Sequence, residues 1–254
     1  MIFDTHAHYD SPRFDADRDA LLSALPANGV DAALTCADSE KSCEAVIALA
    51  EKYPHLWAAC GIHPHNASEV DWEAFEPKLR QYLSHPKCLC LGEIGLDYHY
   101  DFSPRELQRG LFAKQLALAL ELDMPVCVHI RESTEDVLAL LREYRPRGAV
   151  HCFTGSAETA KLLLDMGLYL GFGGAVTFKN ARKSLEAAAS CPLDRLLLET
   201  DAPYMTPEPF RGRRCDSGHI KYTAEKIAAA RGMAAEELIL AAAENGRRLF
   251  GCAR

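Results

Sequence analysis

The sequence predicts a single (β/α)8 TIM barrel over residues 1–254, with a C-terminal helical extension. Three observations predict this fold. Short apolar runs alternate with segments of helical pattern eight times, as repeated βα units do. The runs are rich in Val, Leu, Ile and Cys on both faces, as parallel strands covered by helices should be. A length of 254 residues also suits one α/β domain, because barrels of this size are routinely single domains.

The predicted strands are short apolar runs that each lead into a turn or the start of a helix. In chain order they cover residues 2–8, 30–36, 57–62, 88–94, 125–130, 148–152, 168–172 and 195–200.

Helix signals lie between these runs. Residues 103–106, Ser-Pro-Arg-Glu, match a capping box with proline at the first helical position. Four leucines then follow at helical spacing and should face the barrel: Leu107, Leu111, Leu118 and Leu122. Residues 133–136 predict a similar helix start, and the Ala-rich segments 186–190 and 224–230 are good helix formers. The Pro-containing stretch 203–215 predicts a long loop.

Composition narrows the classes of protein to consider. No apolar run reaches the length of a membrane span, and the N-terminus lacks a signal-type segment, so a cytoplasmic protein is expected. The 10 cysteines show no Cys-x-x-Cys spacing and are expected to be reduced thiols, mostly in the core. A net charge of −8 argues against broad coating of nucleic acid, but it permits a nuclease whose anion site is a local metal centre.

Six polar residues lie at the carboxyl ends of predicted strands, where active sites of such barrels form. They are His6, His8, Glu93, His129, His151 and Asp201. Residues two apart on a strand share a face, so His6 and His8 can reach one ion. Imidazole and carboxylate suit transition metals better than calcium. Six ligands exceed the usual four of one zinc ion, so two ions with a bridging carboxylate are expected.

Each of these residues also has an ordinary structural interpretation. A single His in an apolar strand is more often a hydrogen-bonded core residue, and Asp201 before Ala202-Pro203 could cap a turn. Glu93 is harder to explain in this way, because a carboxylate within an apolar strand needs a partner. The structural interpretation of all six together requires six coincidences at one rim, which favours the metal site.

The charge balance of such a site predicts an anionic substrate. Two divalent cations outweigh two carboxylates and a bridging hydroxide, so the centre remains positive. Metal pairs of this kind clamp the attacking and leaving oxygens of a phosphoryl displacement.

Seven segments resemble the motifs of TatD-type metal-dependent deoxyribonucleases, which belong to the amidohydrolase-like metal barrels. They are residues 4–8, 61–65, 92–98, 129–131, 151–155, 199–203 and 245–250. The resemblance spans nearly the whole chain. It implies a metal-dependent hydrolase of phosphodiesters, with DNA as the expected substrate and no membrane or obligate protein partner. By matched position, it implies that His6, His8 and Asp201 bind one ion and that His129 and His151 bind the other.

The resemblance places Glu93 between two divalent ions, which are expected to be zinc, manganese, magnesium, nickel or iron. Glu93 and Asp201 are the predicted catalytic carboxylates. A metal-activated water is expected to attack phosphorus, and Asp201 is expected to take its proton because it ends a strand beside a loop.

Three further residues are predicted to bind substrate: Arg131, His63 and His65. Arg131 shares the strand parity of His129 and could hold a phosphate bidentately, although a salt bridge to a nearby acid is the alternative. His63 and His65 end the third strand on either side of a proline. A local basic rim could also be formed by four cations: Arg211, Arg213, Arg214 and Lys221.

Two other functions compete with the nuclease. Related barrels hydrolyse a small ester, lactone or amide, but they often bridge their metals with a carboxylated Lys, and no predicted strand contains Lys. A metal-stabilised binding protein is the other possibility, and the open ligand set argues against it. One departure from the TatD pattern bears on substrate choice. Residues 215–218, Cys-Asp-Ser-Gly, replace the Asn-Glu-Pro often found in a loop expected to overlie the site.

Overall fold

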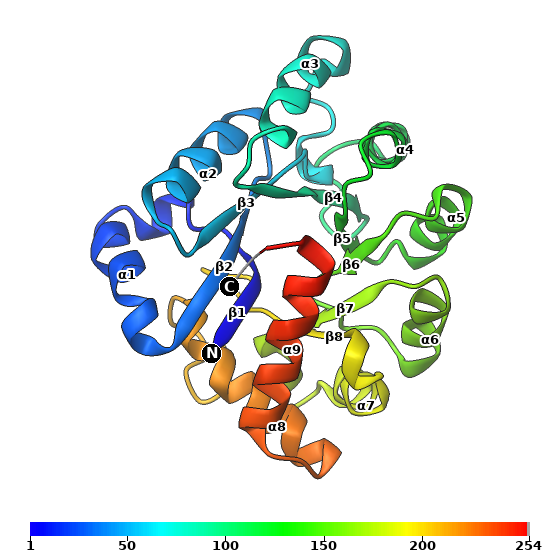
Figure 1. The fold of residues 1–254 in the computed structure, drawn as a ribbon. Coiled ribbons are helices and arrows are strands. Elements are labelled where there is room, and N and C mark those ends of the chain that lie inside the picture. Colours follow the sequence, from blue (N-terminus) through cyan, green and yellow to red (C-terminus); the bar gives the residue numbers. More distant parts are fainter. Residues whose placement is uncertain (253–254) are drawn as a thin grey trace.

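The structure is a computed structural model that describes residues 1–252. Eight strands form one parallel sheet, and their hydrogen-bonded order follows the chain from β1 to β8 (Figure 1). The strands are β1 Ile2–Ala7, β2 Val30–Cys36, β3 Leu56–Cys60, β4 Cys88–Asp97, β5 Val126–Arg131, β6 Gly148–Val150, β7 Tyr169–Phe172 and β8 Leu196–Leu198. The predicted parallel barrel is therefore confirmed, while residue 254, the predicted end of the domain, lies outside the described residues.

The first and last strands come together and nearly close the barrel. Ala7 forms a parallel bridge with Ala202, just beyond the end of β8. The backbone N–H of Asp201 donates to the carbonyl of His6 at 2.9 Å, and that of His8 donates to the carbonyl of Ala202 at 2.6 Å. Because all strands are parallel, this closure brings every carboxyl end to one side of the barrel.

The first eight α-helices surround the barrel and follow its strands in turn, and the last one, α9, lies across the barrel in this view (Figure 1). The helices are α1 Arg18–Ala24, α2 Glu40–Lys52, α3 Trp72–Leu83, α4 Arg105–Glu121, α5 Thr134–Tyr144, α6 Ala157–Asp165, α7 Arg182–Ser190, α8 Ile220–Arg231 and α9 Ala235–Phe250. The predicted C-terminal extension is α9. It packs against the start of β1, where the rings of Phe250 and Phe3 meet edge to face at 6.2 Å. None of the described helices has the length and apolarity needed to cross a membrane.

The start of α4 corrects two predictions. Ser103 does not form a capping box, because its hydroxyl donates to the carbonyl of His65 at 2.8 Å and no side chain caps the helix. Leu107 and Leu122 are exposed rather than turned toward the barrel, whereas Leu111 and Leu118 are buried.

Two buried glutamines explain why the leucine pattern of α4 is misleading. The side chain of Gln115 pairs with both backbone groups of Ile62, at 2.8 and 3.1 Å. Gln108 accepts from the backbone N–H of Asp97 at 2.9 Å. These polar residues lie on the face of α4 that meets the barrel, and they fix the ends of β3 and β4 where the functional side chains begin.

The other local predictions are close to the structure. α5 begins after Ser133, as predicted, although Ser133 donates to the carbonyl of Leu96 instead of capping the helix. The Ala-rich segments lie within α7 and α8. Residues 203–215 contain no described helix or strand, so the predicted long loop after the last strand is confirmed.

Candidate metal centre

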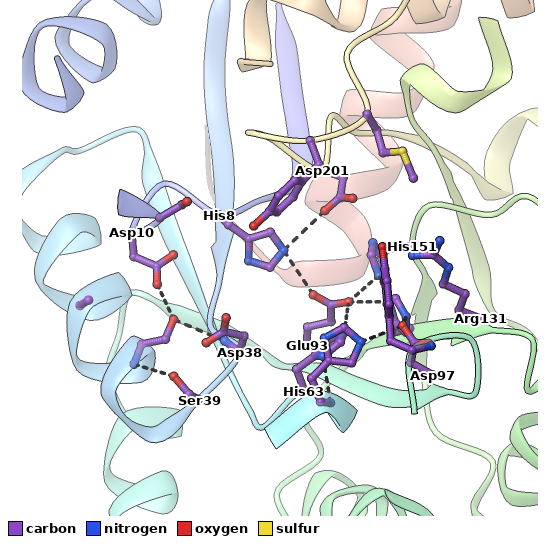
Figure 2. Close-up of a pocket in the computed structure, with 18 of the residues that line it drawn as sticks. His8, Asp10, Asp38, Ser39, His63, Glu93, Asp97, Arg131, His151 and Asp201 are labelled. Atoms are coloured by element: carbon purple, nitrogen blue, oxygen red, sulfur yellow. Dashed lines mark hydrogen bonds and ion pairs between the residues drawn. The ribbon is translucent and has the colours of Figure 1, made fainter. Parts of the chain in front are cut away.

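A cavity of about 760 Å³ opens at the carboxyl end of the barrel (Figure 2). Eight of the nine predicted site residues line this cavity, and the ninth, His6, is fully buried beside it. The eight are His8, His63, His65, Glu93, His129, Arg131, His151 and Asp201. The fold therefore gathers residues from β1, β3, β4, β5, β6 and β8 into one site.

Glu93 lies on β4 at the centre of this site, between two groups of side chains (Figure 2). Its Oε2 atom is 3.3 Å from Nε2 of His6 and 3.3 Å from Nε2 of His8. Oδ1 of Asp201 joins this group at 3.5 Å from Nε2 of His8. His6 lies on β1 and His8 directly follows this strand. Both imidazoles reach the same site because residues two apart in an extended chain point to the same side.

The other oxygen of Glu93 faces three imidazoles from three different strand ends. Its Oε1 atom is 2.7 Å from Nε2 of His151, 2.8 Å from Nδ1 of His129 and 3.4 Å from Nε2 of His63. His63 is buried at the end of β3, next to Glu93, rather than standing at the rim of the cavity. Each carboxylate oxygen of Glu93 therefore has its own set of nitrogen donors.

Asp97 is part of the site although it is not among the predicted ligands or substrate-binding residues; from the sequence it could equally line the mouth or cap a loop. Its Oδ2 atom lies 2.8 Å from Nε2 of His65 and 3.2 Å from Nε2 of His129. Its Oδ1 atom accepts from the backbone N–H groups of His99 and Tyr100, each at 3.0 Å. Asp97 therefore orients two imidazoles and fixes the loop that follows. The sequence did contain one signal: Asp97 and Glu93 are an even number of residues apart on β4, so both side chains point to the same side of the strand.

Glycine at position 95 allows this arrangement. Gly95 lies between Glu93 and Asp97 with φ of 145°, and a Cβ there would overlap the carbonyl oxygen of His129. β4 and β5 can therefore approach closely at the level of the site.

Two buried thiols contact the far side of a candidate ligand. Nδ1 of His6 is 3.1 Å from Sγ of Cys127 and 3.4 Å from Sγ of Cys36. Nδ1 of His8 instead contacts the carbonyl oxygen of Cys36 at 2.8 Å. Both cysteines are buried in the core, but they also set the orientation of these imidazoles. The shared parity of Cys127 and His129 on β5 indicates that both point into the barrel.

Burial and charge oppose each other at the central carboxylate. Burial alone would raise the pKa of Glu93, but the imidazoles of His151, His63 and His6 together hold that pKa well below its ordinary value. Burial lowers the pKa of the His63 imidazole to about 4, so His63 is neutral at physiological pH. Burial would also lower the pKa of His8, but the nearby carboxylates of Asp201 and Glu93 instead raise that pKa above its ordinary value, so a metal ion that binds here would have to displace that proton.

The donor set fits divalent cations. Nε2 of His6 and Nε2 of His8 lie 3.1 Å apart, and both face carboxylate oxygens. Groups of three such donors lie within 4.8 Å of one another, and they include His6, His8 and Asp201 on one side and His63, Glu93 and His129 on the other. Nitrogen and oxygen donors in this mixture suit transition-metal ions.

Arg131 had a salt bridge to a nearby acid as its alternative interpretation. No described carboxylate forms an ion pair with Arg131, whose guanidinium carbon lies 4.6 Å from the centre of the Tyr100 ring. The salt-bridge interpretation of Arg131 is therefore wrong. Glu199, at the end of β8, accepts from the backbone N–H of Cys152 at 2.5 Å and lies 3.8 Å from Nδ1 of His151.

The loop after β8 reaches the cavity through Tyr204, but its departing residues do not line it. None of residues 211–218 lines the cavity in the described part of the chain, so the expectation that residues 215–218 overlie the site is not confirmed. Ser217 is buried and donates to the carboxylate of Asp4 at 2.6 Å, because this segment packs against the start of the barrel. Arg214 pairs with Asp17 and does not form a basic rim.

Comparisons with known proteins agree with this geometry. The sequence model of the family described as TatD related DNase matches residues 3–251. A Bacillus subtilis protein named metal-dependent hydrolase YabD is 40% identical and is aligned over 98% of this chain and 99% of its own length. A 3'-5' ssDNA/RNA exonuclease TatD from Erwinia tasmaniensis is 34% identical, over 98% of this chain and 99% of its own.

A solved structure shows the same architecture. The crystal structure of YjjV, a TatD homologue from Escherichia coli K12, has a TM-score of 0.89 and 32% sequence identity. The alignment covers 99% of this chain and 98% of that protein.

Proposed function

The chain belongs to the TatD-related DNase family of metal-dependent hydrolases, and we propose that it cleaves phosphodiester bonds of DNA with two divalent ions held on either side of Glu93. The observation that carries the proposal is the position of this carboxylate. Its two oxygens face separate sets of imidazole nitrogens at 2.7–3.4 Å. A bridging carboxylate between two ions uses both of its oxygens in this way.

The proposed ligands divide between the two sides of Glu93. His6, His8 and Asp201 would hold one ion, and His129 and His151 would hold the other. His63, at 3.4 Å from Glu93 Oε1, is a further candidate on the second side. The metals themselves are proposed to be zinc, manganese, magnesium, nickel or iron. When bound, such ions supply a nucleophilic water near neutral pH and stabilise the charge on the phosphoryl oxygens.

Asp201 is the proposed general base. Its carboxylate lies at the end of β8, lines the cavity and is partly exposed, so water can approach it. Burial would raise the pKa of Asp201, but hydrogen bonding to His8 and the charge of His6 lower it below its ordinary value. Asp201 is therefore ionised at neutral pH and can accept the proton of a water that attacks phosphorus, while Glu93 remains enclosed by imidazoles.

Three further observations support a nucleic-acid substrate or a cytoplasmic location. Arg131 lines the cavity without a described carboxylate partner, so its guanidinium is available to a phosphate. All ten cysteines are free thiols, which supports a reducing compartment. The printed name of the Erwinia relative, a ssDNA/RNA exonuclease, also points to nucleic acid.

A substrate screen with the purified protein tests this proposal. Single-stranded DNA, duplex DNA, a phosphomonoester, a lactone and an amide would each be offered with zinc, manganese, magnesium or nickel. We expect metal-dependent cleavage of DNA and loss of that cleavage with a chelator. Faster hydrolysis of the lactone or amide would favour the amidohydrolase alternative. The exposed-surface variant Leu162→Ala, on α6, is the matched control for protein handling.

A further inference from the structure

The loop between β4 and α4 carries two exposed aromatic rings beside the cavity. Tyr100 is 48% exposed and Phe102 is 66% exposed, and their rings stack with centroids 5.2 Å apart and planes 17° from parallel. Exposing an aromatic ring to water forgoes the free energy gained by burying its apolar surface. A pair of exposed rings held together on a loop is therefore an unusual surface feature. Tyr100 also lines the cavity that contains Glu93.

The distribution of exposed aromatic side chains points to the substrate. In the part of the chain that the structure describes, three aromatic rings are strongly exposed: Tyr100, Phe102 and Tyr204. Tyr204, 48% exposed, comes from the loop after β8 and lines the same cavity. All three therefore lie on carboxyl-end loops next to the candidate metal centre, whereas the outer helices expose only aliphatic side chains among the large hydrophobic residues.

The stacked pair is held in place by the site itself. Asp97 accepts from the backbone N–H of Tyr100, and its other oxygen contacts His65 at 2.8 Å. The ring of His65 in turn meets both Tyr100 and Phe102 edge to face, at 5.5 and 4.8 Å. Asp97 also contacts His129, so one carboxylate links the loop that carries the aromatic rings to the candidate metal centre.

A cation completes this surface. The guanidinium carbon of Arg131 lies 4.6 Å from the centre of the Tyr100 ring, and Arg131 lines the cavity without a described carboxylate partner. An aromatic ring that binds a nucleobase by stacking, next to a guanidinium that binds phosphate, matches the repeating chemistry of a nucleotide chain.

We propose that Tyr100, Phe102 and Arg131 form a nucleobase-binding subsite, in which an unpaired base stacks on the outer face of Phe102 while its neighbouring phosphate reaches Arg131 and the metal centre. Phe102 itself stacks on Tyr100, whose other face is covered by the Arg131 guanidinium. The inference rests on the proposed function and assigns particular residues to the recognition of an unpaired base; single-stranded nucleic acid is already the substrate in the printed name of the Erwinia relative. Base faces are covered by their neighbours within a duplex, so only an unstacked base can occupy the rings. Stacking involves no base-edge hydrogen bonds, and the subsite therefore tolerates every base.

The test compares two single strands that share one phosphate backbone. One carries normal bases and the other carries abasic sites at the same positions. For the metal-loaded protein, KM should be lower for the strand with bases. In Tyr100→Leu/Phe102→Leu this advantage should shrink by roughly 5- to 150-fold, the range for loss of one base–aromatic stack. The variant Tyr100→Phe/Phe102→Tyr keeps both rings and should retain the advantage. Leu162→Ala is the surface control.

The possible outcomes separate the subsite from the proposed function. Equal loss on both strands, or no loss on either, would overturn the subsite while DNA cleavage stands. If neither strand is cleaved, fluorescence anisotropy is used instead to measure the binding of cleavage-resistant phosphorothioate strands with and without bases. Base-dependent binding that the double Leu variant weakens would then support the subsite and refute the nuclease. If the double variant does not fold, Phe102→Leu alone is used, because Phe102 is the more exposed ring.

Discussion

The two sides of Glu93 are built from different parts of the barrel. On one side, His6, His8 and Asp201 come from β1 and the end of β8, whose backbones are hydrogen-bonded at 2.9 and 2.6 Å. On the other side, three imidazoles come from three separate strand ends. The first side is positioned by main-chain closure of the barrel, and the second is positioned by side chains.

The residues that hold the ligands in position also differ between the two sides. Asp4, fully buried below His6, accepts from the backbone N–H of Thr200 and from the hydroxyl of Ser217, which ties β1 to the segments after β8. The second side depends on Asp97, which contacts His129 at 3.2 Å and ends in an exposed loop. Among the proposed metal ligands, only those on the first side include a carboxylate besides Glu93, namely Asp201. Because a carboxylate ligand attracts a cation more strongly than a neutral imidazole does, we expect the first side to bind its ion more tightly.

The largest expected effect comes from removing the group that both sides share. Glu93→Gln keeps the shape of the side chain but removes the negative charge between the two sets of imidazoles. Both ions should be lost, and activity should fall by roughly 10⁴-fold, the upper end of the range for a catalytic group. Elemental analysis and kcat measure these effects. Glu186→Gln, on the exposed face of α7, is the matched control. A Glu93→Gln protein with full metal content would remove the bridging role.

Asp201→Asn removes a carboxylate from the first side of the site and leaves the second side unchanged. Loss of a general base costs ~10²–10⁴-fold, and loss of a metal ligand should place the effect near the upper end. Metal content decides between the two roles. A variant that keeps both ions and cleaves DNA at nearly the wild-type rate would exclude Asp201 from catalysis. If one ion is lost, the pH–rate profile at saturating metal separates the base from the ligand.

Arg131→Ala tests whether substrate charge is recognised from the second side, where β5 ends. Loss of one charge-assisted hydrogen bond should raise KM for a phosphodiester by roughly 10- to 150-fold. Metal content should stay the same, because Arg131 contacts none of the candidate ligands by a described hydrogen bond or ion pair. An equal loss of activity on a neutral ester would show that Arg131 has a structural role instead.

Asp97→Asn should have a smaller effect that is confined to the second side. Asp97 orients His129 without being one of the proposed ligands, and changes to such supporting groups typically cost ~10–100-fold in metal affinity or activity. Titration of the metal-free protein should therefore show one weakened site and one unchanged site. Weakening of both sites together would contradict the independence of the two sides.

The amino-acid sequence alone was sufficient to predict the barrel and the candidate residues. The alternation of apolar runs with helical segments follows from the period of each element, and parallel strands place their carboxyl ends together. Glu93 stood out because a carboxylate in an apolar strand requires a partner. The helix face of α4 was only partly predicted, because the buried Gln108 and Gln115 are polar. Hydrophobicity alone therefore selected two exposed leucines along with two buried ones.

Only the tertiary structure decided which atoms meet. Strand parity brings His6, His8 and Asp97 toward the barrel interior, but it does not say which oxygen of Glu93 faces which imidazole. Nor does it show that Asp97 anchors the loop bearing Tyr100. Those relations depend on the close approach of β4 and β5 at Gly95 and on the closure of β1 against β8. The residue types and their periodicity determine the fold and the kind of chemistry, because these depend on local pattern. The pairing of donors is determined by packing between strands that are distant in sequence.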